Sequence, residues 1–248
     1  MICKLCRLDK KLVKAHVIPN FMYSGLFNKT HDIISVNLSN PKRRKKIQTG
    51  YFDKNILCES CDNEIIGSYE RHAHKVLFDE QYTNEDNLKS KITVAEDGVK
   101  SFTMNLKYKE FKLFLLSLLW RASITELSFF NRISIKKQDE ERIRVMILNG
   151  DPESSDIFPI SMFKALPPRQ HQTKLIIDPV TVTSDGPDMC IFFINGYFYN
   201  FILSKNTNDV LFDGISIKED NIIVIPVLKN QDAIDYMNSF TQQQIWKH

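Results

Sequence analysis

The chain lacks the sequence features that define several protein classes. No apolar run reaches the ~20 residues that a membrane-spanning helix requires, because Lys112 and Ser117 interrupt the longest one, residues 111–120. The N-terminus has no cationic segment followed by an apolar stretch, so we expect no signal peptide. The chain has no GxxxxGK(S/T) phosphate-binding loop, no GxSxG nucleophile motif and no internal repeat. These absences predict a cytoplasmic protein with no membrane partner.

Cysteine is scarce, but its placement is informative. Only five cysteines occur in 248 residues, and four of them form two CxxC pairs, Cys3 with Cys6 and Cys58 with Cys61. Four thiolates complete the tetrahedral shell that structural zinc prefers. Paired cysteines in a chain without an export signal indicate metal ligands rather than disulfides. The sequence therefore predicts one shared zinc ion, and the alternative is that these are buried core cysteines.

Positive charge is concentrated in the first third of the chain. Residues 1–78 contain 14 Lys/Arg and 7 Asp/Glu, a net of +7, whereas the whole chain is +3, so residues 79–248 carry −4. A cationic module favours a polyanionic partner. Five consecutive cations are predicted to hold a nucleic-acid backbone without reading its sequence; the alternative is a solvated loop. These cations are Lys42, Arg43, Arg44, Lys45 and Lys46.

Hydrophobic periodicity predicts an α+β protein. Expected helices cover residues 62–76, 111–124, 137–148 and 230–245, and residues 152–168 are expected to be mostly loop. Expected strands cover residues 12–18, 33–38, 91–95, 102–108, 174–177, 190–194, 197–203 and 222–227. The polar, acidic stretch 79–90 predicts a boundary between a module of residues 1–85 and an α+β domain of residues 86–248. We expect the second domain to regulate, to select substrates or to bind a protein partner.

The first module resembles the zinc-knuckle form of the HNH endonucleases, which have the ββα-metal nuclease fold. It has a cysteine pair, a strand with histidine and proline, a loop, a second cysteine pair and a helix. The resemblance covers about the first third of the chain. The matching residues are Cys3-x-x-Cys6, Ala15-His16-Val17-Ile18-Pro19, Asn55-Ile56-Leu57-Cys58-x-x-Cys61 and Asp62.

The resemblance implies a role for each matched residue. His16 would be the general base on the attacking water, since the imidazole pKa lies close to working pH. Asp62, directly after the last cysteine, would bind a catalytic Mg²⁺ or Mn²⁺ that stabilises charge on the phosphate. Asn55 matches the middle asparagine of the family only loosely, and Asp53 is better spaced. The plain alternatives are a hydrogen-bonded core histidine and an aspartate that caps the helix.

One position departs from the family pattern. The residue before the histidine is normally Asp or His and ligates the metal, whereas here it is Ala15. Glu70 is a supporting candidate, but eight residues of helix place it about 12 Å from Asp62. Glu70, His72 or His74 would reach the metal if the helix were short or broke at Gly67. Without them, the nuclease site lacks a ligand.

A second resemblance extends over most of the chain. Ala15-His16-Val17-Ile18-Pro19, the second cysteine pair and residues 116–123 are similar to a set of uncharacterised bacterial proteins suspected of acting in defence against phage. Together, the sequence predicts a metal-dependent nuclease, with DNA favoured over RNA. The alternatives are a non-catalytic zinc module that binds nucleic acid or a protein, and a function located in the C-terminal domain.

Overall fold

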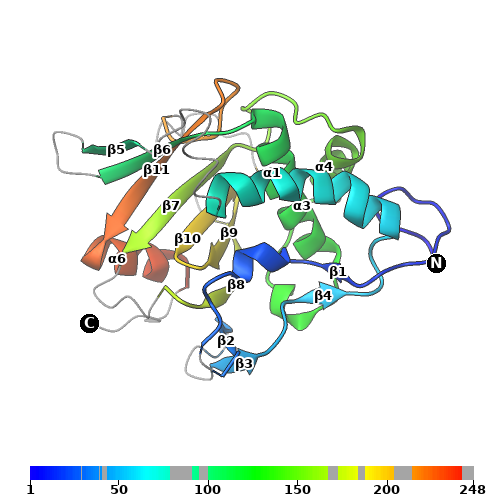
Figure 1. Ribbon diagram of the computed structural model, residues 1–248, viewed down its shortest axis with the longest axis horizontal. Helices are drawn as coiled ribbons and strands as arrows, with labels where there is room; N and C mark the ends of the chain where they lie inside the picture. The colour runs from blue at the N-terminus through cyan, green and yellow to red at the C-terminus, as the bar shows by residue number, and fades with distance from the viewer. Residues whose placement is uncertain are drawn as a thin grey trace.

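The chain folds as a mixed α+β protein, as its periodicity predicts (Figure 1). The computed structural model describes residues 1–28, 30–38, 40, 44–78, 91–94, 100–166, 173–183, 188–203 and 214–241. Lys42, Arg43, the expected boundary at 79–90 and residues 96–98, whose Asp-Gly pair predicts a hairpin turn, lie outside these residues. Within them, no helix is both long enough and apolar enough to cross a bilayer.

The main feature is a nine-stranded sheet in the order β3-β2-β8-β9-β10-β7-β11-β6-β5. Neighbouring strands pair antiparallel, except for the parallel pairs β2–β8 and β7–β11. A separate antiparallel pair joins β1 to β4. The strands are β1 (Ala15–His16), β2 (Ile33–Val36), β3 (Lys45–Ile47), β4 (Phe52–Asp53), β5 (Lys91–Val94), β6 (Lys100–Asn105), β7 (Ile160–Leu166), β8 (Ile176–Val182), β9 (Met189–Ile194), β10 (Tyr197–Ile202) and β11 (Ile222–Lys229).

Four α-helices and three shorter turns complete the described elements. The helices are α1 (Gly67–Phe78), α3 (Tyr108–Ile124), α4 (Lys137–Asn149) and α6 (Asn230–Thr241). The turns are the 3-10 helices η1 (Asn20–Tyr23) and η3 (Ser128–Phe130) and the π-helix η2 (Ser60–Ile66), which runs directly into α1. Gly150 ends α4 with a φ of 66°, because a residue without Cβ adopts this left-handed conformation at little cost.

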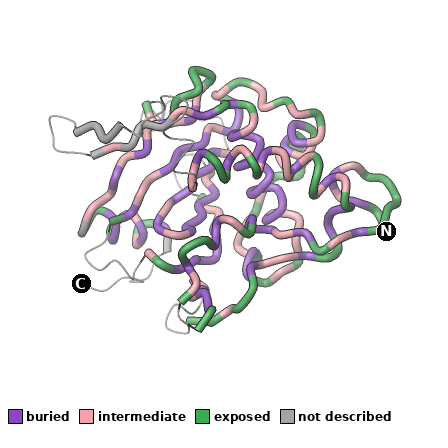
Figure 2. The backbone as a smooth tube through the Cα atoms, viewed as in Figure 1, coloured by how far each residue is buried: buried purple, intermediate pink, exposed green. Residues whose placement is uncertain are grey.

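Alternation along the central strands separates two hydrophobic clusters. Phe192 on β9 and Phe201 on β10 belong to the larger cluster, which contains the apolar residues of α3. Phe193 and Phe198, on the same strands, pack in a smaller cluster with Ile234 and its neighbours on α6. Helix α3 is buried on almost every side, as the central tube in Figure 2 shows. It therefore connects the sheet to the N-terminal part of the chain.

Two sequence predictions were wrong about strands. Residues 160–166 form β7 instead of a loop, because pairing with β10 on one side and β11 on the other overrides the flanking prolines. The strand expected over residues 12–18 is reduced to Ala15 and His16, which pair with the two residues of β4. Leu12 makes only an isolated bridge to Cys58.

The first 78 residues share their core with the rest of the chain. Strand β2 pairs with β8 through Ser35 and Ile176, so a strand of the first module extends the main sheet. The larger hydrophobic cluster includes Ile18 and Ile66 together with Phe114 of α3. The division at residue 85 stays a prediction, and any boundary there would separate segments that share one core.

Candidate functional site

The four paired cysteines converge on one point, as their spacing predicts. Their sulfur atoms all lie within 4.8 Å of one another, and the sulfurs of Cys6 and Cys58 are 3.9 Å apart. A tetrahedral zinc ion with Zn–S bonds of 2.3 Å needs sulfurs about 3.8 Å apart. The residues therefore fit a structural metal ion such as zinc.

Backbone hydrogen bonds bring the two cysteine pairs together. The Lys4 N–H donates to the Ile56 carbonyl at 2.8 Å, and the Val13 N–H donates to the Leu57 carbonyl at 2.9 Å. The Cys58 N–H donates to the sulfur of Cys3 at 3.3 Å, a contact that favours a thiolate. Burial acts to raise the pKa of Cys58, but hydrogen bonds from Ser60 and from the other cysteines lower it to about 6. The ligand set is held in place by the fold around it.

His16 lies on β1, where it pairs with Phe52 of β4. The imidazole is half-buried, and its ring meets the Phe52 ring edge-on at 6.4 Å between centroids. Burial lowers the pKa of His16 below its usual value of 6.5; Glu70 raises it, and Lys14 and Arg121 lower it. The net result favours a neutral imidazole at pH 7, the form that accepts a proton.

Asp62 lies in the first turn of η2, one residue after the last cysteine. No side chain caps this end of the helix, and among the described residues the Asp62 carboxylate has no hydrogen-bond or ion-pair partner. Burial raises the pKa of Asp62 to about 6; Arg121 lowers it, and Glu70 raises it further. The carboxylate is half-buried, and Arg121 offsets only part of the effect of burial on its pKa, an arrangement typical of functional carboxylates.

Glu70 and Arg121 connect the helix to the strand of His16. The Arg121 guanidinium is 1% exposed, and its Nη1 lies 2.8 Å from Oε1 of Glu70 and donates to the backbone carbonyl of His16 at 2.6 Å. The helix does not break at Gly67, which keeps an αR conformation. Glu70 therefore faces β1 from within a continuous helix. Its buried Oε1 makes no hydrogen bond among the described residues, so the ion pair is what balances its charge.

Arg121 is the residue that sequence reasoning placed without a role. An arginine within the apolar run of this helix is expected to be buried or at an interface, and the structure shows it buried. Two further donors hold it to its own helix, Nε to the Ser117 carbonyl at 3.1 Å and Nη2 to the Ser117 hydroxyl at 3.3 Å. A charge on an apolar helix requires a partner, and this is the signal that was available. The partners, Glu70 and the backbone carbonyl of His16, are distant in sequence, so spacing did not identify them.

The structure also places Asn55, Asp53 and Ala15. Asn55 is exposed, and its backbone N–H donates to Oδ1 of Asp53 at 2.8 Å. Asp53 pairs with Ala15 instead of His16, and its Oδ2 accepts from the Thr125 hydroxyl at 2.6 Å, so it fixes the loop. Ala15 itself is fully buried.

The structure also describes His72, His74 and three of the five consecutive cations. The ring of His72 accepts a hydrogen bond from the Lys107 N–H at 3.0 Å, and the exposed His74 packs against Phe21. Arg44 and Lys45 are exposed at or beside β3, an edge strand of the main sheet, and Lys46 lies 3.7 Å from Asp32. Among the described residues, only the four cysteines form a group of three or more ligand-type side chains that could share an ion.

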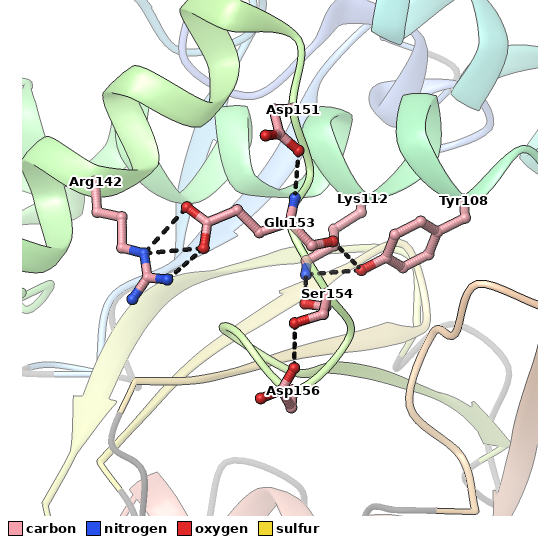
Figure 3. A network of polar contacts seen from close by, with 7 residues as sticks. All are labelled: Tyr108, Lys112, Arg142, Asp151, Glu153, Ser154 and Asp156. Atoms are coloured by element: carbon pink, nitrogen blue, oxygen red, sulfur yellow. Dashed lines mark hydrogen bonds and ion pairs between the residues drawn. The ribbon is translucent and has the colours of Figure 1, made fainter.

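A second buried polar cluster lies near the start of α3 (Figure 3). The Lys112 ammonium donates to the Tyr108 hydroxyl at 2.9 Å and to the Ser154 carbonyl at 2.7 Å, and the Tyr108 hydroxyl donates to the Glu153 carbonyl at 2.8 Å. Burial lowers the pKa of Lys112 to about 8, although Glu219 and Glu153 oppose this shift. These bonds tie the loop between α4 and β7 to α3. We interpret the cluster as structural.

Comparison with protein-family models, with curated proteins and with solved structures finds no match to this chain. The function is therefore inferred from the residues and contacts described above. They provide four cysteines that fit a metal ion, and a half-buried His16 that Arg121 connects to Glu70.

Proposed function

We propose that this protein is a metal-dependent endonuclease of the HNH type, which hydrolyses phosphodiester bonds of nucleic acid. The observation that carries the proposal is the approach of His16 to the carboxylate-bearing helix that follows the cysteine cluster. Two short antiparallel strands, β1 and β4, precede that helix, an order that supports a zinc-stapled ββα module. Phage defence is the setting suggested by the sequence resemblance.

The proposed roles follow from protonation and burial. His16, neutral at pH 7, takes a proton from the attacking water, which requires an unprotonated imidazole near working pH. Arg121 fixes the strand of His16 through the backbone carbonyl, so it positions the base and does not touch the substrate. The cysteine cluster holds the strand and the helix together.

The divalent metal that the family implies fits only a small ligand set here. Ala15 has no ligand atom, and the Oε1 of Glu70 is occupied by Arg121, so Asp62 is the carboxylate left to hold the ion. Mg²⁺ accepts one or two carboxylates together with phosphate oxygens of a substrate, so Asp62 meets the minimum requirement. When bound, the metal would neutralise charge on the phosphate.

The alternative is a non-catalytic zinc module that binds nucleic acid or a protein partner. Ala15 is the specific observation in its favour, because a buried alanine replaces a ligand of the family pattern. Both functions use the same cysteine cluster, so zinc content does not separate them. Catalysis does.

The test is nicking of supercoiled plasmid by purified protein in Mg²⁺ or Mn²⁺, with a structured RNA assayed in parallel. His16→Ala is expected to lower the rate at least about 100-fold, the effect of losing a general base, with zinc content unchanged. Asp62→Asn should also lose activity. Glu64→Gln, an exposed carboxylate of the same helical turn, is the matched control and should keep it. Metal-dependent cleavage that survives in His16→Ala, or none in the parent, contradicts the proposal.

A further inference from the structure

One exposed cation lies directly beside His16. Lys14 precedes β1 by one residue, and its Nζ is 3.6 Å from the centroid of the Phe52 ring. The same ring meets the His16 ring in an edge-to-face arrangement across the β1–β4 pair. Lys14 and His16 therefore contact one aromatic side chain, and the three form a continuous surface at the candidate site.

The charge of Lys14 is not balanced by a carboxylate. Two other cations of the N-terminal part are paired, Arg7 with Glu141 and Lys46 with Asp32. Across the segments that the structure describes, Lys14 has no ion-pair partner, and its side chain is exposed. An unpaired ammonium at a surface remains available to an anion.

Arg121 cannot bind a substrate in its place. Its guanidinium is 1% exposed, and its nitrogens contact Ser117, the His16 carbonyl and Glu70. Lys14 is thus the cation that is both near the imidazole and reachable from solvent. Ala15 also stands where the family pattern has a metal ligand, so the site has one ligand fewer for a divalent cation. A side-chain cation can therefore contribute more of the positive charge that a phosphate needs.

We propose that Lys14 is a substrate-binding residue of the nuclease site, where its ammonium, oriented by the Phe52 ring, binds the phosphate adjacent to His16. This inference rests on the proposed function. A cation held over an aromatic face keeps its position before the anion arrives, so less freedom is lost on binding. The role is distinct from that of Lys45 and Lys46, which lie on β3 at the edge of the main sheet (Figure 1).

The experiment measures single-turnover nicking and duplex binding for Lys14→Gln against Lys11→Gln. Lys11 is the matched control because it is exposed, lies on the same segment and has no ion-pair partner in the described chain. Lys11→Gln should weaken duplex binding by a small factor, since it loses one phosphate-attracting charge, and Lys14→Gln should weaken it more, since only Lys14 is held in position for the phosphate. Only Lys14→Gln should lower the single-turnover rate, by about tenfold or more. Lys14→Arg, which keeps the charge and stacks on an aromatic ring, should retain most of the rate.

A second measurement does not depend on activity. The groups that face His16 are Lys14, Glu70, Arg121 and the Phe52 ring, and Lys14 lowers the pKa of the imidazole. An NMR titration should therefore give a higher His16 pKa in Lys14→Gln than in the parent or in Lys11→Gln. An unmoved pKa, or equal rates for the two glutamine variants while His16→Ala is inactive, overturns the role of Lys14 and leaves the nuclease intact. A parent that binds DNA without cleaving it overturns both.

Discussion

Removal of the Glu70 carboxylate tests most directly how Arg121 links α1, which carries Glu70, to β1, which carries His16. Glu70 is the ion-pair partner of Arg121, whose guanidinium is 1% exposed, and the Glu70 side chain is 24% exposed. Glu70→Ala leaves the guanidinium charge buried without a carboxylate. Breaking a buried ion pair in this way costs about 3–5 kcal/mol, and the partial exposure of Glu70 places the expected loss near 3 kcal/mol.

The size of this effect makes it easy to measure. For a chain of this length, 1 kcal/mol changes Tm by roughly 2–4 °C, so Glu70→Ala should lower Tm by about 6–12 °C in zinc-containing buffer. Urea unfolding followed by circular dichroism gives the free energy of unfolding. Glu64→Ala, which removes an exposed carboxylate of the preceding turn, should change it by less than about 0.5 kcal/mol.

A double variant separates two effects of Glu70→Ala: the uncompensated charge left on Arg121 and the loss of the Glu70 side-chain contacts. Combining Glu70→Ala with Arg121→Met removes the uncompensated guanidinium, so part of the stability lost in Glu70→Ala should return. Two results would refute the reasoning: a loss below about 1 kcal/mol in Glu70→Ala, or a double variant less stable than Glu70→Ala. Either would mean that the guanidinium is hydrated or paired elsewhere.

Three further outcomes are expected. Cys58→Ser should abolish stoichiometric zinc and lower Tm, by metal analysis and melting, because metal-binding energy is folding energy. Burial raises the pKa of Asp178 from 3.8 to about 6, which favours the protonated carboxyl in the folded state. The free energy of unfolding of the parent should therefore fall as pH rises between these two values. In urea titrations, Asp178→Asn should be more stable than the parent at pH 8, by up to roughly 3 kcal/mol, but not at pH 4. Neutralising Lys45 and Lys46 should weaken duplex binding for all sequences and flatten its salt dependence.

Local signals in the sequence were sufficient for part of the fold. The cysteine cluster was predictable because each pair lies in one short turn, and a shared ion requires the pairs to meet. Strands at residues 190–194 and 197–203 were predictable, and the Asn195-Gly196 pair between them is typical of a hairpin turn because both residues tolerate positive φ; their φ values are 52° and 81°. The helices α3 and α4 were predictable from hydrophobic periodicity.

Non-local contacts account for what was missed. Strand β7 is specified by its pairing with β10 and β11, which flank it in space and not in sequence. The contact of Arg121 with the His16 carbonyl joins residues 105 positions apart, so it could not be predicted from sequence spacing. Helix geometry alone separates Asp62 from Glu70 by about 12 Å. It does not reveal that the Arg121 guanidinium, which comes from α3, acts on both carboxylates.

The parallel pairing of β2 with β8 has a consequence for synthesis on the ribosome. All four cysteines have been translated once residue 61 is added, so the metal ligands are complete early. Strand β2 then waits for Ile176, and at roughly 5–20 residues per second this takes on the order of ten seconds. During that interval the edge of β2 that later pairs with β8 is unpaired, and an unpaired strand edge can associate with other chains. A closed cysteine cluster would shorten the free length of chain that carries β2, and thereby restrict what it can meet.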